Sequence, residues 1–144
     1  MKARIALGFD FGLRRIGLAS GDTLTRTAAP LATVAHHDDG PDWAAIDRQL
    51  RALGPDLLVV GAPYNDDGSP GRIAQLADAF ATALAARYRL EIARIDERYS
   101  STAAQSLLRE QRASGQRRKV VRKGDLDSAA AAVMLQSWLE QNRD

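Results

Sequence analysis

Four acidic residues lie at the predicted ends of strands and at the start of a predicted helix, where α/β folds commonly place functional side chains. Asp10 ends a short apolar run, Asp96 and Glu97 end another, and Asp127 opens an apolar helical stretch. In mixed sheets, the carboxyl ends of neighbouring strands meet in one crevice. Carboxylates gathered there repel one another unless one takes up a proton or a cation supplies the missing charge. The spacing is typical of a cation site, although such carboxylates are also common structural devices.

The cation expected at such a set is Mg²⁺ or Mn²⁺, because both are hard ions that prefer oxygen ligands. Two of these ions about 4 Å apart can activate a water molecule and stabilise the leaving oxygen of an in-line displacement. Asp125 is the expected N-cap of the final helix, which would put Asp127 in its first turn, where the helix dipole favours an ionised carboxylate. The predicted chemistry is metal-dependent hydrolysis of a phosphodiester.

Basic residues could bring a phosphate to these carboxylates. Arg14 and Arg15 follow Asp10 closely, although solvated arginines in an ordinary hairpin turn are the alternative interpretation. Six of the 20 Lys and Arg residues fall in one short stretch, namely Arg112, Arg117, Arg118, Lys119, Arg122 and Lys123. We expect residues 112–124 to form a mobile loop that binds nucleic acid, with Lys123 nearest to Asp127. A solvated basic turn without a role is the alternative.

Other chemistries are disfavoured by composition. The chain has no cysteine, which removes disulfides, thiolate nucleophiles and cysteine-based zinc sites. His36 and His37 are adjacent, so on a strand they would point to opposite faces, and we expect both at the surface. No histidine is placed to activate Ser100 or Ser101. The sequence shows neither a signal peptide nor an apolar run of membrane-spanning length, so a cytoplasmic protein is expected.

Hydrophobic periodicity predicts an α/β fold in one domain, residues 1–144. Three strands joined by short connections should form an antiparallel meander, with Pro30 at an edge or bulge, and two more strands should complete a five-stranded mixed sheet with flanking helices. The expected strands are Arg4–Asp10, Ile16–Ser20, Thr27–His36, Asp56–Gly61 and Leu90–Ile95. The expected helices are Asp42–Leu53, Arg72–Tyr88, Thr102–Arg112 and one that follows Asp125. Gly12 would allow a tight turn and Gly17 a close approach of the second strand.

Four segments together resemble one family, the YqgF-type proteins, described as pre-16S rRNA nucleases and as Holliday junction resolvase-like. The motifs occur in the family's order from about Ile5 to Leu139. They are Asp10-Phe11-Gly12 with Ile16-Gly17; Val59-Val60-Gly61-Ala62-Pro63 with Asn65, Asp67-Gly68 and Gly71; Asp96-Glu97-Arg98-Tyr99-Ser100-Ser101 with Ala104; and Lys123 with Leu126-Asp127-Ser128-Ala129-Ala130.

The resemblance implies a ribonuclease H-like fold, and it implies Asp10, Glu97 and Asp127 as the acidic trio that binds Mg²⁺ or Mn²⁺. The implied role is processing of the 5′ end of precursor 16S rRNA in ribosome biogenesis, with ribosomal particles as further partners and a monomer or weak dimer as the working form. Two alternatives stay open: a junction-resolving nuclease that acts on branched DNA, and an RNA-binding assembly factor without hydrolytic activity.

Overall fold

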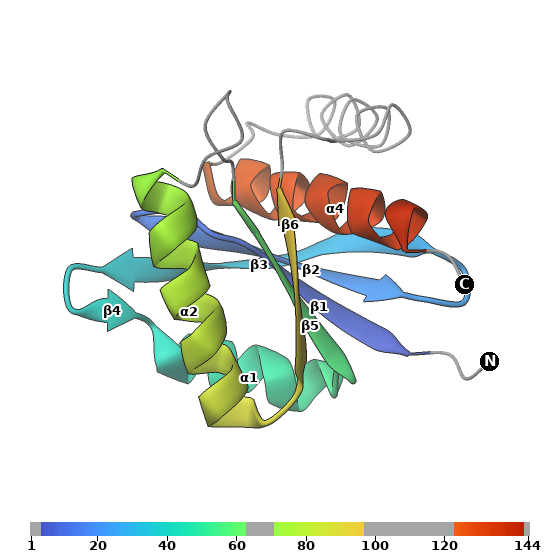
Figure 1. Cartoon of the computed structure of the whole chain (residues 1–144), viewed down its shortest axis with the longest axis horizontal. Coiled ribbons are helices and arrows are strands. Elements are labelled where there is room, and N and C mark those ends of the chain that lie inside the picture. The colour runs from blue at the N-terminus through green and yellow to red at the C-terminus, as the bar shows by residue number, and fades with distance from the viewer. Residues whose placement is uncertain (1–3, 63–70, 97–122, 143–144) are drawn as a thin grey trace.

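The computed structural model describes residues 4–62, 71–96 and 123–142, and the elements of these residues are drawn in Figure 1. The strands are β1 (Ile5–Asp10), β2 (Arg15–Asp22), β3 (Thr27–His37), β4 (Gly40–Pro41), β5 (Leu57–Ala62) and β6 (Glu91–Asp96). The helices are α1 (Trp43–Leu53), α2 (Arg72–Tyr88) and α4 (Lys123–Gln141). The predicted helix Thr102–Arg112 lies outside the described residues.

The strands form one mixed sheet in the order β4-β3-β2-β1-β5-β6. β1, β2 and β3 pair antiparallel, as the short connections predicted, whereas β5 pairs parallel with both β1 and β6. The described sheet has six strands rather than the predicted five, because Gly40 and Pro41 add a two-residue strand beside the end of β3. A strand of two residues is too short to show the alternating pattern from which strands are predicted.

Pro30 lies at a bulge, as predicted. In the β2–β3 pairing, Leu18 is opposite Ala32 and Ala19 is opposite Pro30, so Leu31 has no partner on β2. Proline cannot donate a backbone hydrogen bond. The missing bond is tolerated here because the ladder is already interrupted at this point of an exposed strand.

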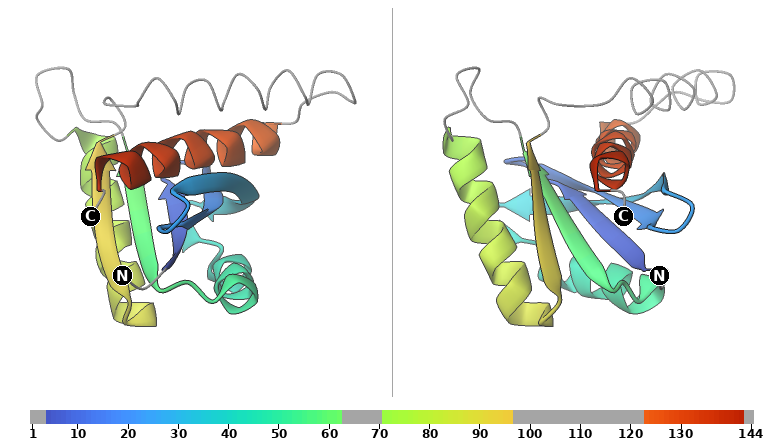
Figure 2. Two further views of the ribbon diagram at one scale, coloured as in Figure 1. Left: turned by 90° about the vertical axis from the view of Figure 1, so that its right-hand side faces the viewer. Right: turned by 45° about the vertical axis from the view of Figure 1, so that its right-hand side comes forward.

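Side chains alternate between two hydrophobic cores, one on each face of the sheet. Leu7 and Phe9 of β1 pack with α1 and α2 in the first core. Ala6 of β1 and Val59 of β5 pack with α4 in the second core, where Met134 and its helix neighbours cover the sheet. Figure 2 shows this arrangement, with α4 crossing one face and α1 and α2 on the other. Each residue's position along its strand therefore decides which helix it meets.

The predicted helix bounds hold to within one residue in α1 and α2 but not in α4. The Asp42 side chain caps α1 by accepting a hydrogen bond from the Ala45 amide at 3.1 Å, and Gly54 ends α1 at a φ of 63°. α2 has the predicted bounds. α4 begins at Lys123, so the predictions of Asp125 as its N-cap and of Lys123 within a loop were wrong. None of the helices in the described ranges is long and apolar enough to cross a bilayer.

Polar contacts join α1 to the C-terminal end of α2. Tyr88 of α2 donates its phenol proton to Asp47 of α1, and the Arg87 guanidinium bonds the same carboxylate at 3.2 Å while lying 4.8 Å from the centre of the Trp43 ring. Burial first, and the hydrogen bond to Asp47 second, raise the pKa of Tyr88 to about 12. Hydrogen bonds from Arg87 and Tyr88 lower the pKa of Asp47.

Candidate active site

Asp10 is the last residue of β1, and its position on the strand places it on the face that α4 covers. It is opposite Gly17 on β2 and Gly61 on β5. A Cβ atom added to Gly17 or Gly61 would meet α4, and directly paired residues point to the same side of a sheet. The carboxylate of Asp10 therefore lies on the α4 face, at the end of β1 where the parallel strands β5 and β6 also end.

Asp127 reaches the same corner from the other end of the chain. A Cβ atom at Gly17 would stand 2.0 Å from the backbone oxygen of Asp127, so the beginning of α4 rests directly on this glycine. Since Gly17 is the register partner of Asp10, Asp10 and Asp127 are brought together across one residue of β2. Asp127 is the fifth residue of α4 rather than a residue of its first turn, which weakens the predicted influence of the helix dipole.

Arg15 occupies this corner as well. Its Nε donates to Oδ2 of Asp127 at 2.5 Å, while 42% of the Arg15 side chain and 30% of the Asp127 side chain are exposed. The sequence prediction had given Arg15 to phosphate binding, and the structure shows it paired with a carboxylate of the predicted trio. Its neighbour Arg14 is exposed, which suits the predicted contact with nucleic acid.

His36 holds the turn that follows Asp10. Its Nδ1 donates to the Gly12 carbonyl at 2.8 Å, its amide donates to the Arg14 carbonyl at 2.9 Å, and its ring packs edge-on against Phe11. His36 is half-buried, so the expectation that it lies at the surface holds only in part, whereas His37 is exposed as expected. No local pattern could have revealed this role, since the bond spans 24 residues of sequence.

The third member of the predicted trio, Glu97, lies outside the described residues, as do Arg112, Arg117, Arg118, Lys119 and Arg122. Asp96, the last residue of β6, follows Ile95, which belongs to the core under α4. Strand alternation therefore puts Asp96 on the opposite face from Asp10. Within the described ranges, no three acidic or histidine side chains form a metal-binding group.

The close packing of α4 on the sheet accounts for glycine at position 61. A Cβ atom there would lie 2.5 Å from Cγ of Met134 in α4, so a larger residue would push the helix away from the sheet. Close packing of α4 is therefore a sufficient reason for glycine at this position.

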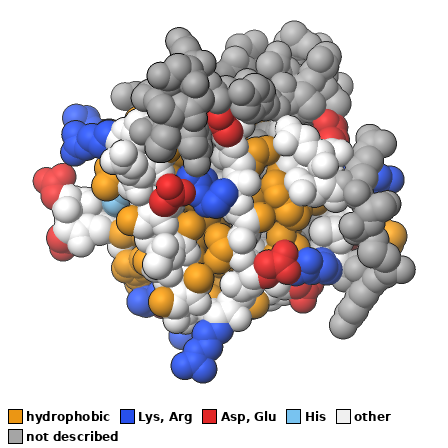
Figure 3. All heavy atoms as spheres, in the orientation of Figure 1, with side chains coloured by type: hydrophobic (Ala, Val, Ile, Leu, Met, Phe, Trp, Pro, Cys, Tyr) orange, Lys and Arg blue, Asp and Glu red, His pale blue; other side chains and the backbone are white. Residues whose placement is uncertain are grey.

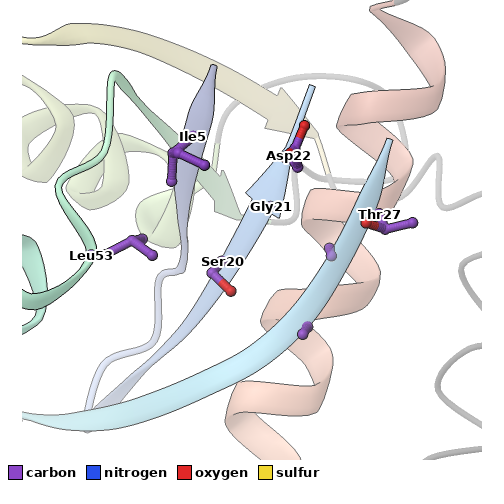
Figure 4. Close-up of a pocket in the computed structure, with 8 residues that line it drawn as sticks. Ile5, Ser20, Gly21, Asp22, Thr27 and Leu53 are labelled. Carbon is purple, nitrogen blue, oxygen red and sulfur yellow. The ribbon is translucent and has the colours of Figure 1, made fainter. Parts of the chain in front are cut away.

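A pocket of about 320 Å³, drawn in Figure 4, lies beside the beginning of β1. It is lined by Ile5, Ser20, Gly21, Asp22, Thr27, Ala28, Ala29 and Leu53. Ile5 begins the strand that Asp10 ends, and five residues of strand span roughly 16 Å. Asp22 is already engaged there, because its Oδ1 accepts the Leu24 amide at 2.7 Å. This pocket is therefore separate from the corner that holds Asp10 and Asp127.

Figure 3 shows one face of the molecule, on which the Lys and Arg side chains lie apart and some adjoin acidic groups. Ion pairs occur among the described residues, since Arg4 meets Glu91 at 2.8 Å and Arg94 meets Asp78 at 2.9 Å. The described residues of this face do not form a continuous basic surface that would follow a nucleic-acid backbone.

The sequence matches one family model over residues 4–141, and that family is described as RuvX, Holliday junction resolvase. Curated relatives cover nearly the whole chain and carry the name "Putative pre-16S rRNA nuclease". The relative from Edwardsiella ictaluri is 43% identical, over 97% of this chain and 97% of its own. The relative from Escherichia coli O157:H7 is 41% identical, over 94% of this chain and 95% of its own. The resemblance seen in the four motifs is confirmed.

Solved structures of junction resolvases share the architecture. Thermus thermophilus RuvC in complex with a Holliday junction substrate aligns with a TM-score of 0.55 at 15% identity, over 96% of this chain and 94% of the other. The fowlpox virus resolvase with Holliday junction DNA aligns with a TM-score of 0.56 at 13% identity, over 95% and 97% of the two chains. At such low identity the likeness shows the fold alone, and it confirms the predicted ribonuclease H-like class.

Proposed function

Because this chain belongs to the RuvX family, we propose that it is a metal-dependent nuclease that hydrolyses phosphodiester bonds at a site formed by Asp10, Glu97 and Asp127. One observation of the structure supports this most strongly. α4 rests on Gly17, the register partner of Asp10, so two carboxylates from opposite ends of the chain share one corner of the sheet. Glu97 is proposed as the third carboxylate because Asp96 lies on the other face.

The residues at this corner fit a hard divalent cation. Asp10 and Asp127 offer oxygen ligands, and Arg15 shows that the Asp127 carboxylate already accepts a positive partner at 2.5 Å. Mg²⁺ or Mn²⁺ held there would activate a water molecule and stabilise the leaving oxygen. The protein's own contribution is to fix the carboxylates on rigid elements, β1 and α4, and to hold the turn after Asp10 through His36.

Precursor 16S rRNA is the substrate that we favour, processed at its 5′ end in the cytoplasm during ribosome biogenesis. The names of relatives at about 40% identity support this choice. Ribosomal particles would then be partners, and one nuclease domain acting as a monomer or weak dimer would suffice. Branched DNA is the second candidate, supported by the family's description. A junction resolvase would act as a symmetric dimer matched to a two-fold substrate, so the oligomeric state helps to separate the two.

The purified protein should be assayed with Mn²⁺ on precursor rRNA, on single-stranded DNA and on a four-way junction. We expect cleavage of the precursor rRNA, and we expect Asp10→Asn and Asp127→Asn each to lower the rate by orders of magnitude. Glu91→Gln is the matched control, because it removes one exposed carboxylate at the opposite end of the sheet.

Each result of this assay decides one part of the proposal. Cleavage of the four-way junction alone would favour the DNA nuclease. Binding of precursor rRNA without cleavage of any substrate would favour an RNA-binding assembly factor. Parent-level cleavage by Asp10→Asn would show that the catalytic site lies elsewhere.

A further inference from the structure

Arg15 lies where a cation would be needed. It begins β2 on the α4 face, two residues before Gly17, and strand alternation gives Arg15, Gly17 and the paired Asp10 the same side of the sheet. Its guanidinium bridges from the sheet to Oδ2 of Asp127, which is 112 residues away in sequence. A fixed positive charge thus contacts one of the two carboxylates that we propose as metal ligands.

The form of this contact separates it from a structural ion pair. The bond uses Nε alone and joins two partly exposed side chains, whereas the strongest arginine–carboxylate pairs are bidentate. Exposed pairs of this kind stabilise a protein weakly, by up to about 1 kcal/mol, which corresponds to roughly fivefold in an equilibrium constant. A divalent cation could therefore displace the guanidinium from Asp127 at a modest free-energy cost.

We infer that Arg15 is a positioning residue that holds the Asp127 carboxylate in place of a divalent cation and thereby lowers the metal affinity of the nucleic-acid-free protein. The inference rests on the proposed metal-dependent function and adds a regulation of that site. Arg15 and a cation compete for Asp127, so metal binding must first break the Nε–Oδ2 bond. The carboxylate meanwhile stays beside Asp10 instead of turning towards solvent, which keeps the corner assembled before metal arrives.

The test is a Mn²⁺ titration by calorimetry at fixed ionic strength, with no nucleic acid present. Arg15→Gln removes the competing charge and the bond, and we expect it to tighten Mn²⁺ binding two- to fivefold. Arg14→Gln is the matched control. Arg14 is the exposed neighbour of Arg15 and carries the same charge, but it does not make the bond to Asp127. Arg14→Gln should tighten Mn²⁺ binding clearly less than Arg15→Gln does. Arg15→Lys retains the charge but lacks Nε, so its affinity should lie between those of the parent and Arg15→Gln.

A second background shows whether the effect passes through Asp127. In Asp127→Asn, the further change Arg15→Gln should no longer tighten Mn²⁺ binding. An equal effect of Arg15→Gln and Arg14→Gln, or a gain that persists beside Asp127→Asn, would reduce Arg15 to a distant charge and overturn the inference. Weaker binding by Arg15→Gln would overturn it as well.

Failure of the proposed function gives a different result. If Mn²⁺ binds the parent with an affinity that Asp127→Asn leaves unchanged, the metal site lies elsewhere and both proposals fail. If Asp127→Asn weakens binding while Arg15→Gln matches the parent, the metal site stands and only the role of Arg15 is wrong.

Discussion

At the scale of single residues, Gly17 connects the two halves of the candidate site. Its missing side chain is the space that the backbone of Asp127 occupies. The sequence predicted that this glycine permits a close approach, but it assigned the approach to a neighbouring strand. The approaching element is a helix more than 100 positions further along the chain, and no local pattern contains that information.

Gly17→Ala should destabilise the fold and misplace Asp127. The new methyl group would overlap a backbone carbonyl 2.0 Å away, which only a shift of α4 can relieve, so we expect a loss of about 2 kcal/mol or more of unfolding free energy. Gly8→Ala is the control, because its new methyl group would lie 3.2 Å or more from Leu135 and Met134 of α4 and would meet only side-chain atoms. Denaturant unfolding and cleavage rates would check both variants. Equal effects of the two substitutions would contradict this account.

His36→Ala should lower the rate of cleavage more than it lowers stability. The lost hydrogen bond to the Gly12 carbonyl costs on the order of 1 kcal/mol, but it frees the turn that follows Asp10. Cleavage rates and melting temperatures of His36→Ala and His37→Ala would be compared, since His37 is the exposed neighbour. The expectation is wrong if both variants cleave substrate at the rate of the parent protein.

At the scale of elements, periodicity was informative wherever one face of a helix or strand is buried. The stripe of Ile73, Leu76, Ala77, Phe80 and Leu84 predicted α2 with the bounds that the structure has. All of these residues pack on one core except Leu76, which is exposed. α4 was harder, since alanine-rich sequence has little contrast between its faces, and an apparent cap at Asp125 outweighed the two helical residues before it. A capping residue marks a candidate start of a helix, but it does not exclude a start one or two residues earlier.

The contact between α1 and α2 should make stability depend on alkaline pH. The pKa of Tyr88 lies at about 12 in the folded protein, above its ordinary value of 10.0, because burial and Asp47 favour the protonated phenol. A raised pKa contributes stability that is complete below pH 10 and is lost as the pH rises through 12. Tyr88→Phe should therefore lower the melting temperature at neutral pH and make its decline between pH 10 and 12 shallower.

Asp47→Asn tests the cause of that shift. Removing the carboxylate should move the phenol titration, followed by ultraviolet absorbance, towards lower pH. It should also reduce the loss of stability in acid, because the lowered pKa of Asp47 contributes stability above pH 3.8 that disappears as the pH falls. An unchanged phenol titration in Asp47→Asn would leave burial as the sole cause.

At the scale of the whole molecule, the fold class followed from the sequence, whereas the assembly of the site did not. Short connections predicted the meander of β1, β2 and β3, and the apolar run of β5 predicted a strand buried on both faces. The order of the parallel strands and the placement of α4 depend on contacts between distant segments. Those contacts decide that Asp10 and Asp127 share a corner, which the sequence suggested only through their positions at strand and helix ends and through the family motifs.

Divalent cations should stabilise the folded protein through this site. A ligand that binds only the folded state raises the melting temperature by mass action, so Mn²⁺ should raise it in the parent. In Asp10→Asn most of this rise should vanish while the fold stays intact. Melting curves with and without Mn²⁺ would check both statements, and an undiminished rise in the mutant would locate the ion elsewhere.

The basic residues Arg117, Arg118 and Lys119 are proposed to bind the substrate backbone. Replacing all three by alanine should weaken binding several-fold at low salt and reduce the log–log salt slope by about 2, because each lost phosphate contact removes roughly 0.7 for a single strand. Stabilisation by Mn²⁺ should survive, since the carboxylates are untouched. Binding with the parent's affinity and slope would exclude these residues from the nucleic-acid contact.

The packing of α4 on Gly17 also determines when, during synthesis of the chain, the proposed site can form. During translation every strand of the sheet leaves the ribosome before α4 does, so a nascent chain carries Asp10 long before it carries Asp127. The two proposed ligands meet only when α4 docks on the sheet, so cleavage would require that helix to have been synthesised and released from the ribosome. A protein proposed to trim ribosomal RNA would thus be unable to cleave RNA while α4 is still inside the ribosome that makes it.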